Sequence, residues 1–268
     1  MKRILSVQDL SCVGRCSLTV ALPILSAMGI HCSVLPTAVL STHTGFPGPH
    51  IHSLTEDIVP ICRHLTEVGA KFDAISIGYL SSPEQAEAVL ELMESFDCPV
   101  ILDPVMGDHG KLYKGFTQEN VSVLRDLAAM ADVVLPNVTE AFLLTGLPYQ
   151  EQIDGQMLRM MLGSLCRKKT STVVITGVAP SQDQIGFVGL ERQEGMFSYL
   201  AERRSKLLHG TGDMFSAVFS GAYLLGRDPM EAAQLAADFV VRVLDNTADA
   251  TPFGGKFETQ LPWLWQQL

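Results

Sequence analysis

Basic residues are scarce in this sequence. The 268 residues include 19 Lys and Arg against 29 Asp and Glu, which gives a formal net charge of −10 and a pI near 5.1. Nucleic acids and anionic membranes bind basic surfaces, so this balance argues against both as partners. A small anionic ligand is not excluded, because a few local groups are enough to hold it.

Charge of either sign is missing from residues 16–55, a stretch of 40 residues between Arg15 and Glu56. A transmembrane helix needs about 20 consecutive, mainly apolar residues. The best candidate here, Leu18–Leu40, is interrupted by two prolines, a glycine and a histidine. Its first half, Ser17–Met28, has helical periodicity, and its second half reads as a strand. The uncharged stretch therefore predicts a buried helix followed by a buried strand.

Signals for secretion, disulfides and structural zinc are also lacking. The apolar run Ile4–Val7 is too short for the core of a signal peptide, which favours a cytoplasmic protein. The six cysteines are scattered, so we expect reduced and mostly buried thiols. Cys12 and Cys16, with His31 and Cys32 downstream, do not have the tight paired spacing of a structural zinc site.

The common phosphate-binding and hydrolase motifs are absent. Gly110-Lys111 and Gly255-Lys256 lack the upstream glycine of a P-loop, and Phe215 stands where G-x-G-x-x-G would need its last glycine. Neither H-E-x-x-H nor G-x-S-x-G occurs. P-loop nucleoside triphosphatases and Rossmann dehydrogenases are therefore disfavoured.

What the sequence does contain is an alternation of short apolar runs with longer amphipathic ones. This pattern predicts parallel βαβ units and a sheet that is covered by helices on both faces. The predicted strands are Ile4–Val7, Cys32–Val39, Phe72–Ile77, Val100–Leu102, Val133–Leu135 and Thr172–Ile175. The predicted helices are Ser17–Met28, Pro83–Phe96, Leu124–Met130, Glu140–Leu144 and Met157–Cys166. Ser81 and Glu84 are expected to form a capping box at the start of the second helix.

The pattern changes near residue 184. Gln184–Leu190 and Gly195–Leu200 read as a hairpin, and two helices follow at Thr211–Leu225 and Met230–Leu244. No Pro-, Gly- or Ser-rich linker divides the chain. We therefore predict one domain over residues 1–268, an α/β three-layer α/β/α sandwich with a mostly parallel central sheet and a C-terminal antiparallel hairpin at its edge.

Polar residues follow successive predicted strands. In open α/β sheets, ligands bind beyond the carboxyl ends of the strands. The residues at these ends are Gln8-Asp9, Ser41–Gly45, Gly78-Tyr79, Asp103-Pro104, Pro136-Asn137 and Thr176-Gly177. Turn chemistry alone would account for any one of them. Their recurrence indicates a site along one edge of the sheet.

The strongest single motif is Gly210-Thr211-Gly212-Asp213, which precedes an amphipathic helix. Such a turn leaves the first N–H groups of the helix free to bind an anion, and the helix dipole adds positive character. The alternative is that Thr211 or Asp213 only caps the helix, but a cap does not need two glycines. Asp213 could accept the proton of an incoming hydroxyl group, and the dipole would keep it ionised.

Two further segments allow a structural and a functional interpretation. Asp103 and Asp108 lie five residues apart in a glycine-containing loop, where carboxylates suit magnesium or phosphate chemistry but an ordinary turn is equally compatible. Asn137 and Glu140 either cap a helix or hold a metal ion through water. The residues alone leave both alternatives open.

In this order, the segments resemble the ribokinase superfamily and, within it, the pyridoxal (vitamin B6) kinases. The superfamily signature G-x-G-D is matched by Gly210–Asp213. More selective for the pyridoxal kinases are S-x-H-T-G-F at residues 41–46, Gly78-Tyr79, D-P-V-M-G-D at residues 103–108 and P-N-x-x-E-A at residues 136–141. The similarity extends from Ser6 to the last predicted helix pair.

The resemblance implies ATP-dependent phosphorylation of the 5′-hydroxymethyl group of pyridoxal, pyridoxine or pyridoxamine. It implies that Asp213 is the base and that Gly210, Thr211 and Gly212 form an anion hole. It places Asn137, Glu140 and Thr176 along ATP and Mg²⁺, Asp103, Asp108 and Tyr113 near the phosphates, and His43, Thr44 and Tyr79 in the vitamin pocket. Asp103 and Glu140 are the implied metal ligands, through water. A monovalent cation and a homodimer are further features that the family suggests.

One residue departs from the family pattern. Pyridoxal kinases commonly have a serine after the glutamine that follows the first strand, whereas this chain has Asp9. A carboxylate there could pair with a protonated ring nitrogen or an amine, which would favour pyridoxamine, or it could mark a different hydroxymethyl heterocycle. The hydroxymethylpyrimidine kinases of thiamine synthesis are the alternative; their usual Gly-rich opening is absent. A non-catalytic nucleotide- or vitamin-binding regulator is a third interpretation, which the intact Gly210–Asp213 motif disfavours.

Overall fold

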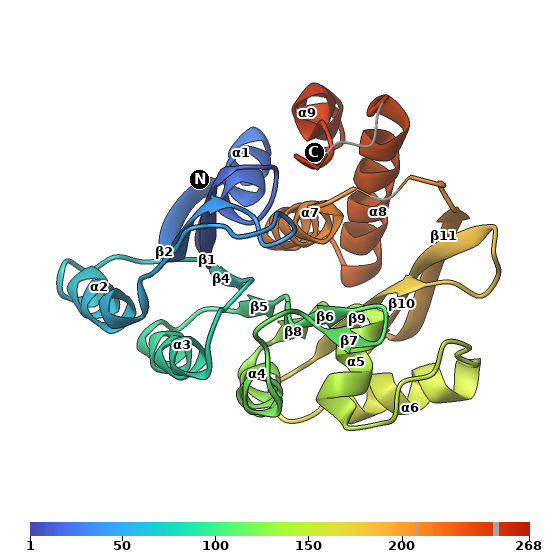
Figure 1. The fold of residues 1–268 in the computed structure, drawn as a ribbon, viewed down its shortest axis with the longest axis horizontal. Coiled ribbons are helices and arrows are strands. Elements are labelled where there is room, and N and C mark those ends of the chain that lie inside the picture. Colours follow the sequence, from blue (N-terminus) through green and yellow to red (C-terminus); the bar gives the residue numbers. More distant parts are fainter. Residues whose placement is uncertain (207, 249–251) are drawn as a thin grey trace.

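The protein is a nine-stranded sheet between two layers of helices (Figure 1). The computed structural model describes residues 1–206, 208–248 and 252–268. The strands are β1 (Arg3–Val13), β2 (His31–Thr42), β3 (Ile51–Ser53), β4 (Ala74–Ile77), β5 (Val100–Leu102), β6 (Gly107–Asp108), β7 (Lys111–Leu112), β8 (Val133–Val134), β9 (Thr172–Val178), β10 (Gln184–Glu191) and β11 (Gly195–Glu202). The helices are α1 (Leu18–Ala27), α2 (Thr55–Glu67), α3 (Pro83–Ser95), α4 (Gln118–Met130), α5 (Val138–Thr145), α6 (Gly155–Leu165), α7 (Thr211–Leu224), α8 (Pro229–Asn246), a 3₁₀ turn (Phe257–Gln260) and α9 (Leu261–Gln266).

The order of strands in the main sheet is β11-β10-β9-β8-β5-β4-β1-β2-β3. The six strands from β9 to β2 are mutually parallel. The β10–β11 hairpin is antiparallel and closes one edge of the sheet, as predicted. The sequence analysis did not predict β3, a three-residue antiparallel strand at the other edge. The three-layer α/β/α prediction is confirmed.

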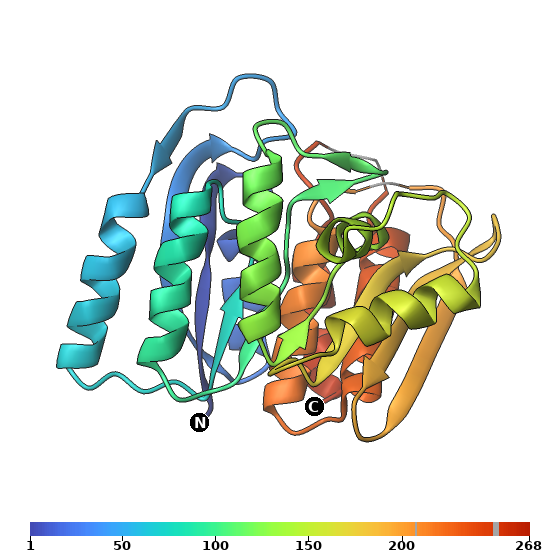
Figure 2. The same ribbon diagram turned by 90° about the horizontal axis from the view of Figure 1, so that it is seen from below.

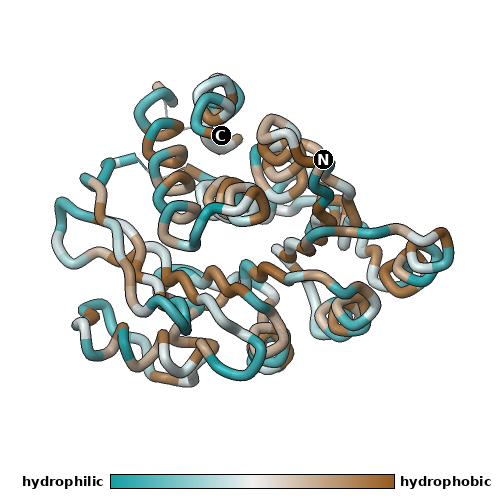
Figure 3. The backbone as a smooth tube through the Cα atoms, turned by 180° about the vertical axis from the view of Figure 1, so that it is seen from behind, coloured by the Kyte–Doolittle hydropathy of each residue, from teal (hydrophilic) through white to brown (hydrophobic). Residues whose placement is uncertain are grey.

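Helices cover both faces of the sheet (Figure 2). One core cluster joins α1, α7, α8 and α9 to the sheet, and two others lie under α2–α4 and under α5–α6. Apolar residues are concentrated along the central strands (Figure 3). Burial of this surface is the main favourable contribution to folding.

The uncharged stretch forms the predicted helix and strand. Val20, Ile24 and Leu25 of α1 are buried, and β2 pairs with β1 in the interior of the sheet. Helix α1 packs closely on α7, because a Cβ built at Gly221 would lie 2.5 Å from the sulfur of Met28. Within the part of the chain that the structure describes, no helix is both long and apolar enough to cross a bilayer.

Several predicted boundaries differ from the structure. The N-cap of α3 is Ser82, whose hydroxyl accepts from the N–H of Gln85, so the predicted Ser81–Glu84 box is wrong by one residue. Helix α2 was missed although its residues are clearly amphipathic, because Pro60 lies inside it and a proline usually ends a helix. The six cysteines are free, but the expectation that most are buried is wrong: two are buried, three are half-buried, and Cys12 is exposed because β1 extends past the buried core.

Candidate active site

The parallel strands all end on the same side of the sheet, at the top of Figure 2, and the N-terminus of α7 lies there too. This edge, formed by the carboxyl ends of the strands, is distinct from the two edges formed by the outer strands β3 and β11. Most of the residues that the sequence analysis singled out are on this edge. They form two groups on either side of Asp213: a carboxylate group around Asp103 and Glu140, and a second group around Asp9, Tyr79 and His43.

The N-terminus of α7 has the features of an anion-binding turn. Gly210 is the N-cap, with a φ of 82°, and no side chain caps the helix. The first intrahelical bond runs from the N–H of Met214 to the carbonyl of Gly210, at 2.9 Å. The N–H groups of Thr211, Gly212 and Asp213 therefore have no carbonyl acceptor within the helix, and that of Asp213 donates to its own carboxylate. The alternative that Thr211 or Asp213 only caps the helix is wrong, and the Thr211 hydroxyl donates to the carbonyl of Leu208 at 3.4 Å.

The two glycines of this turn are needed for different reasons. A Cβ at Gly210 would lie 2.0 Å from the carbonyl oxygen of Arg15, so this position packs directly against the segment that follows β1. Among the residues that the structure describes, and outside its own turn of helix, a Cβ at Gly212 would meet no heavy atom within 4 Å. The helix thus begins with one tightly packed glycine and one that faces open space, as a cradle for a ligand requires.

Asp213 lies in the first turn of α7 and is half-buried. Its carboxylate accepts from the N–H of Ser17 and from its own N–H. Burial and the negative charge of Asp9 raise its pKa to about 6. The helix dipole was expected to lower the pKa of Asp213, whereas burial and the charge of Asp9 raise it. Asp213 remains mostly ionised at pH 7, and a pKa near the working pH suits a general base.

Glu140 is 2% exposed, and its carboxylate connects α5 with the chain at Met106 and at Asn137 through hydrogen bonds. One oxygen accepts from the N–H of Asn137 at 2.8 Å and the other from the N–H of Met106 at 3.1 Å, while the Asn137 side chain accepts from the N–H of Glu140. The capping interpretation of these two residues is therefore confirmed. Burial raises the pKa of Glu140 to about 8.

Asp103 lies beside Glu140 at the end of β5. Burial raises the pKa of Asp103 well above its usual range, and the negative charges of Glu140 and Asp213 add to the effect, while a hydrogen bond from Ser216 opposes it. Buried carboxylates that face one another are costly unless a cation or a proton neutralises them. This oxygen-rich donor set therefore fits a divalent cation such as Mg²⁺. Over the described ranges, no three His, Cys, Asp or Glu side chains form a metal site by themselves.

The small β6–β7 hairpin lies over these carboxylates. His109 and Gly110 have positive φ angles of 51° and 75°, as in a two-residue hairpin turn, and the N–H of Gly110 donates to the Thr139 hydroxyl at 2.9 Å. Asp108 is exposed. Burial and the charges of nearby carboxylates, Glu140 foremost, raise the pKa of Tyr113, which places its hydroxyl among them.

Thr176 lies in the same group as Asp103 and Glu140, next to Asn137. It is paired with Asn137 through an isolated parallel bridge, and its N–H donates to the carbonyl of Pro136 at 2.9 Å. The Asn137 side chain in turn donates to the carbonyl of Gly107 at 2.8 Å. The structure thus brings Asn137, Thr176 and the hairpin together, as the sequence analysis expected.

Asp9 is the central residue of the second group and is 4% exposed. Its carboxylate accepts from the hydroxyls of Ser17, at 2.5 Å, and Ser11, at 3.1 Å. Burial raises the pKa of Asp9. The pKa of Tyr79 is raised to about 12, first by burial and then by the charge of Asp9.

His43 forms a wall of the second group. Its Nε2 lies 2.7 Å from the carbonyl oxygen of Pro252, and its Nδ1 accepts from the N–H of Gly45 at 3.1 Å. These partners assign the proton to Nε2 and leave neither ring nitrogen free for a ligand. The ring packs against Phe46 and His209, with centroids 4.8 and 4.6 Å away. Thr44, the next residue, is exposed.

Sequence reasoning missed three serines that contact the predicted carboxylates: Ser216, Ser17 and Ser11, of which Ser11 donates to Asp9. Ser216 donates to Asp103, and the spacing of three residues from Asp213 on the same helix face could have revealed it. Ser17 contacts both Asp9 and Asp213, and no sequence signal pointed to it.

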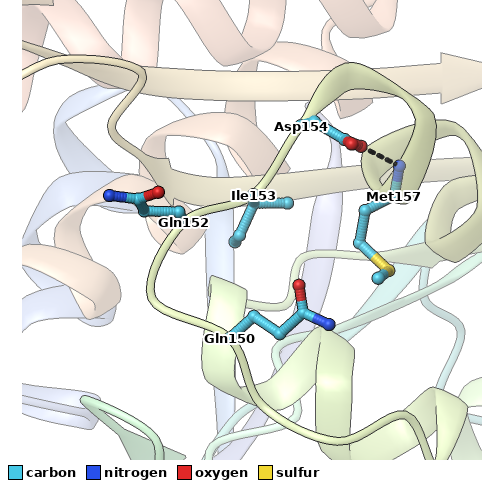
Figure 4. Close-up of a pocket in the computed structure, with 5 residues that line it drawn as sticks. All are labelled: Gln150, Gln152, Ile153, Asp154 and Met157. Carbon is cyan, nitrogen blue, oxygen red and sulfur yellow. Dashed lines mark hydrogen bonds between the residues drawn. The ribbon is translucent and has the colours of Figure 1, made fainter.

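A separate hollow of about 300 Å³ is lined by Gln150, Gln152, Ile153, Asp154 and Met157 (Figure 4). All five residues come from one segment at the start of α6. Asp154 is used there as the helix N-cap and accepts from the N–H of Met157 at 2.7 Å. This hollow contains none of the residues described above, so it does not belong to the site.

Glu140→Ala is expected to destabilise the protein by at least about 2 kcal/mol, because it leaves buried N–H groups of Asn137 and Met106 without an acceptor. Urea unfolding measures the effect. The matched control is Glu119→Ala, which removes an exposed acidic residue from the first turn of α4 and should cost less than about 0.5 kcal/mol. Equal losses in the two variants would contradict the structural role of Glu140.

Together, the fold and the site define a kinase of the ribokinase superfamily: an anion cradle at a helix N-terminus, a carboxylate beside it, and the neighbouring carboxylates of Glu140, buried, and Asp103, half-buried, at the same sheet edge. The chain belongs to the phosphomethylpyrimidine kinase family, whose model matches residues 22–258, and its relatives assign it to the pyridoxal kinase branch.

Three relatives illustrate the similarity. The chain is 31% identical to a pyridoxine/pyridoxal/pyridoxamine kinase of Bordetella pertussis (strain Tohama I), over 92% of this chain and 90% of that protein. It is 30% identical to a hydroxymethylpyrimidine/phosphomethylpyrimidine kinase of Staphylococcus aureus (strain MRSA252), over 75% of this chain and 72% of the relative. The crystal structure of pyridoxal kinase from Lactobacillus plantarum has a TM-score of 0.92 and 33% identity, and covers 100% of this chain and 98% of its own.

Proposed function

We propose that this protein transfers the γ-phosphoryl group of ATP to the 5′-hydroxymethyl group of a B6 vitamer: pyridoxal, pyridoxine or pyridoxamine. The observation that carries the proposal is Asp213, a half-buried carboxylate with a pKa near 6 beside the free N–H groups of α7. A related phosphomethylpyrimidine kinase homologue from Bacteroides thetaiotaomicron, 35% identical, crystallised with pyridoxal, which supports the choice of acceptor.

In the proposed reaction, Asp213 accepts the proton of the substrate hydroxyl as that oxygen attacks the γ-phosphorus. The bond from the γ-phosphorus to the bridging oxygen of ADP breaks as the new P–O bond forms. The products are the phosphate ester and ADP, and the proton on Asp213 returns to solvent. Because the transition state of phosphoryl transfer is loose, most of the catalysis comes from positioning and charge stabilisation.

The N–H groups of Thr211 and Gly212, with Gly210 as the turn residue, stabilise charge on the transferred group. Asp103 and Glu140 would hold Mg²⁺ through water, and the bound ion would neutralise phosphate charge. In this proposal ATP binds on the same side of Asp213 as Asp103 and Glu140. It is lined there by Asn137, Thr176, Asp108 and Tyr113. A monovalent cation is a further proposed ligand of this side.

The second group of residues forms the acceptor pocket in this proposal. Tyr79, Thr44 and the ring of His43 provide its walls, and Asp9 provides its negative charge. Because serine hydroxyls already occupy both sides of the Asp9 carboxylate, its effect on the substrate is exerted mainly through charge. A vitamer with a protonated ring nitrogen or amine is therefore the preferred acceptor.

A hydroxymethylpyrimidine kinase is the second candidate, favoured by the family model and by the Staphylococcus aureus relatives. The test is incubation of the purified protein with Mg-ATP and each of pyridoxal, pyridoxine, pyridoxamine and hydroxymethylpyrimidine, with the products separated by chromatography. Phosphorylation of a vitamer at the higher kcat/KM supports the proposal. Preference for the pyrimidine, or ATP binding without turnover of any acceptor, would overturn it.

The pH dependence of kcat/KM follows from the pKa of Asp213. A base must be deprotonated to act, so kcat/KM should be level above pH 7 and fall about tenfold per pH unit below about pH 6. Asp9, facing Asp213, contributes to this raised value. The measurement uses a vitamer whose own ionisation is recorded separately. A rate that stays constant down to pH 5 would contradict the assignment of the base.

We further infer that the chain works as a single kinase domain in a cytoplasmic homodimer. One sheet contains strands from Arg3 to Glu202, which supports the single domain. Light scattering coupled to size-exclusion chromatography should give about twice the chain mass of 29.1 kDa. A mass equal to that of one chain would overturn the dimer.

A further inference from the structure

The backbone of Ser17 has an unusual conformation. Its φ of 47° and ψ of −129° lie in a region that residues with a Cβ rarely adopt. His109 and Lys168 are the other non-glycine residues of positive φ among those described, and both are exposed. Ser17 is 5% exposed, so the conformation is imposed inside the protein, next to the site.

Helix capping does not account for Ser17. It is the N-cap of α1, a position where a serine hydroxyl normally accepts from an N–H of the first turn, but its side chain makes no such bond. Only its carbonyl serves the helix, by accepting from the N–H groups of Val20 and Ala21 at 3.0 and 2.9 Å. Nearby, the hydroxyl of Thr19 bonds to the carbonyls of Gly14 and Cys16.

Both polar groups of Ser17 point to carboxylates of the site instead. Its hydroxyl donates to Asp9 at 2.5 Å, and its N–H donates to the carboxylate of Asp213. An ordinary N-cap conformation would direct these two donors elsewhere. The conformation of Ser17 therefore lets this residue connect the carboxylate of Asp9, which is buried, with that of Asp213, which is half-buried.

We propose that Ser17 is a positioning residue for phosphoryl transfer: its N–H orients the carboxylate of Asp213, and its hydroxyl holds Asp9 at a fixed place beside that carboxylate. The inference rests on the proposed role of Asp213. It goes beyond that role in assigning the orientation of the base to a residue that does not contact the reacting atoms. The bond from Ser17 also opposes the rise in the pKa of Asp9 that burial causes.

The test compares Ser17→Ala and Ser17→Gly with the wild type, on whichever acceptor the wild type phosphorylates. Both variants lose the bond to Asp9, so kcat should fall about 10- to 100-fold at saturating substrates while both KM values stay within about threefold. A poorer orientation of the base raises the free energy of the transition state and leaves the ground-state binding of the substrates unchanged. Should Ser17→Ala fail to fold, Ser17→Gly, which adopts a positive φ without strain, gives the same measurement.

A double variant distinguishes positioning from a purely structural role. If Ser17 acts through Asp9, Asp9→Asn/Ser17→Ala should be no slower than the slower single variant, because the two residues work as one unit. The matched control is Ser26→Ala, an exposed serine at the end of the same helix, which should keep its kcat.

Three results would overturn the positioning role: unchanged kcat in both folded Ser17 variants, a loss confined to KM, or additive losses in the double variant. These are distinct from a failure of the proposed function. In that case the wild type itself would phosphorylate no vitamer in the acceptor panel, and the Ser17 comparison would be made on the acceptor that it does use.

Discussion

Asp213→Asn is expected to lower kcat by about 10²- to 10⁴-fold, the usual contribution of a positioned acid or base. The amide has nearly the same shape as the carboxylate, so the N–H groups of α7 and the glycine turn should stay in place. ATP affinity, measured by calorimetry, should therefore change little. Removal of one of two facing negative charges should even raise the stability slightly, because Asp9 loses its repulsive neighbour.

The control for this variant is Asp126→Asn, which changes an exposed carboxylate on α4 and should leave kcat unchanged. Near-normal turnover in Asp213→Asn would show that another group accepts the proton. A loss of ATP affinity as large as the loss of kcat would assign Asp213 to phosphate or metal binding instead of proton transfer.

The fold was largely predictable because its signals are local. β-Branched runs such as Thr172–Ile175 and the hairpin at residues 184–200 report directly on burial and turn position. Once the strands were known to be parallel, the meeting of Asp103, Asn137 and Thr176 at one edge followed from topology alone. Helix α2 was missed because one local signal is misleading there: Pro60 lies inside the helix, whereas a proline in a sequence usually predicts a helix end.

The parts of the site that could not be predicted depend on tertiary contacts. The contact of Ser17 with two carboxylates depends on its positive φ, and a serine in the sequence does not predict a positive φ. The pKa of Asp213 is set by burial and by Asp9, more than 200 positions away in the sequence, and these oppose the local effect of the helix dipole. Asn137 and Glu140 illustrate a different case: the capping interpretation is confirmed, and their burial makes the proposed metal role compatible with it.

The second large effect is expected at the glycines of the α7 turn. Gly210→Ala places a methyl group 2.0 Å from the carbonyl oxygen of Arg15 at a φ of 82°, so backbone must move. The overpacking and the strained φ should together destabilise the protein by about 2–4 kcal/mol. Because the N–H groups of the cradle shift with the backbone, kcat should also fall by about 10²-fold. Denaturant unfolding and steady-state kinetics measure the two losses.

Gly212→Ala is the matched variant that separates binding from folding. Beyond its own turn of helix, its methyl group meets no atom of the described residues within 4 Å, and alanine is a better helix former than glycine, so the stability should be equal to or up to about 1 kcal/mol above that of the wild type. The Cα–Cβ bond of a helical residue tilts toward the N-terminus, so the methyl group extends to the place where an anion would sit. We therefore expect kcat/KM for ATP to fall at least tenfold. A variant that is stable and fully active would show that no phosphate occupies this turn, and the anion cradle would then be wrong.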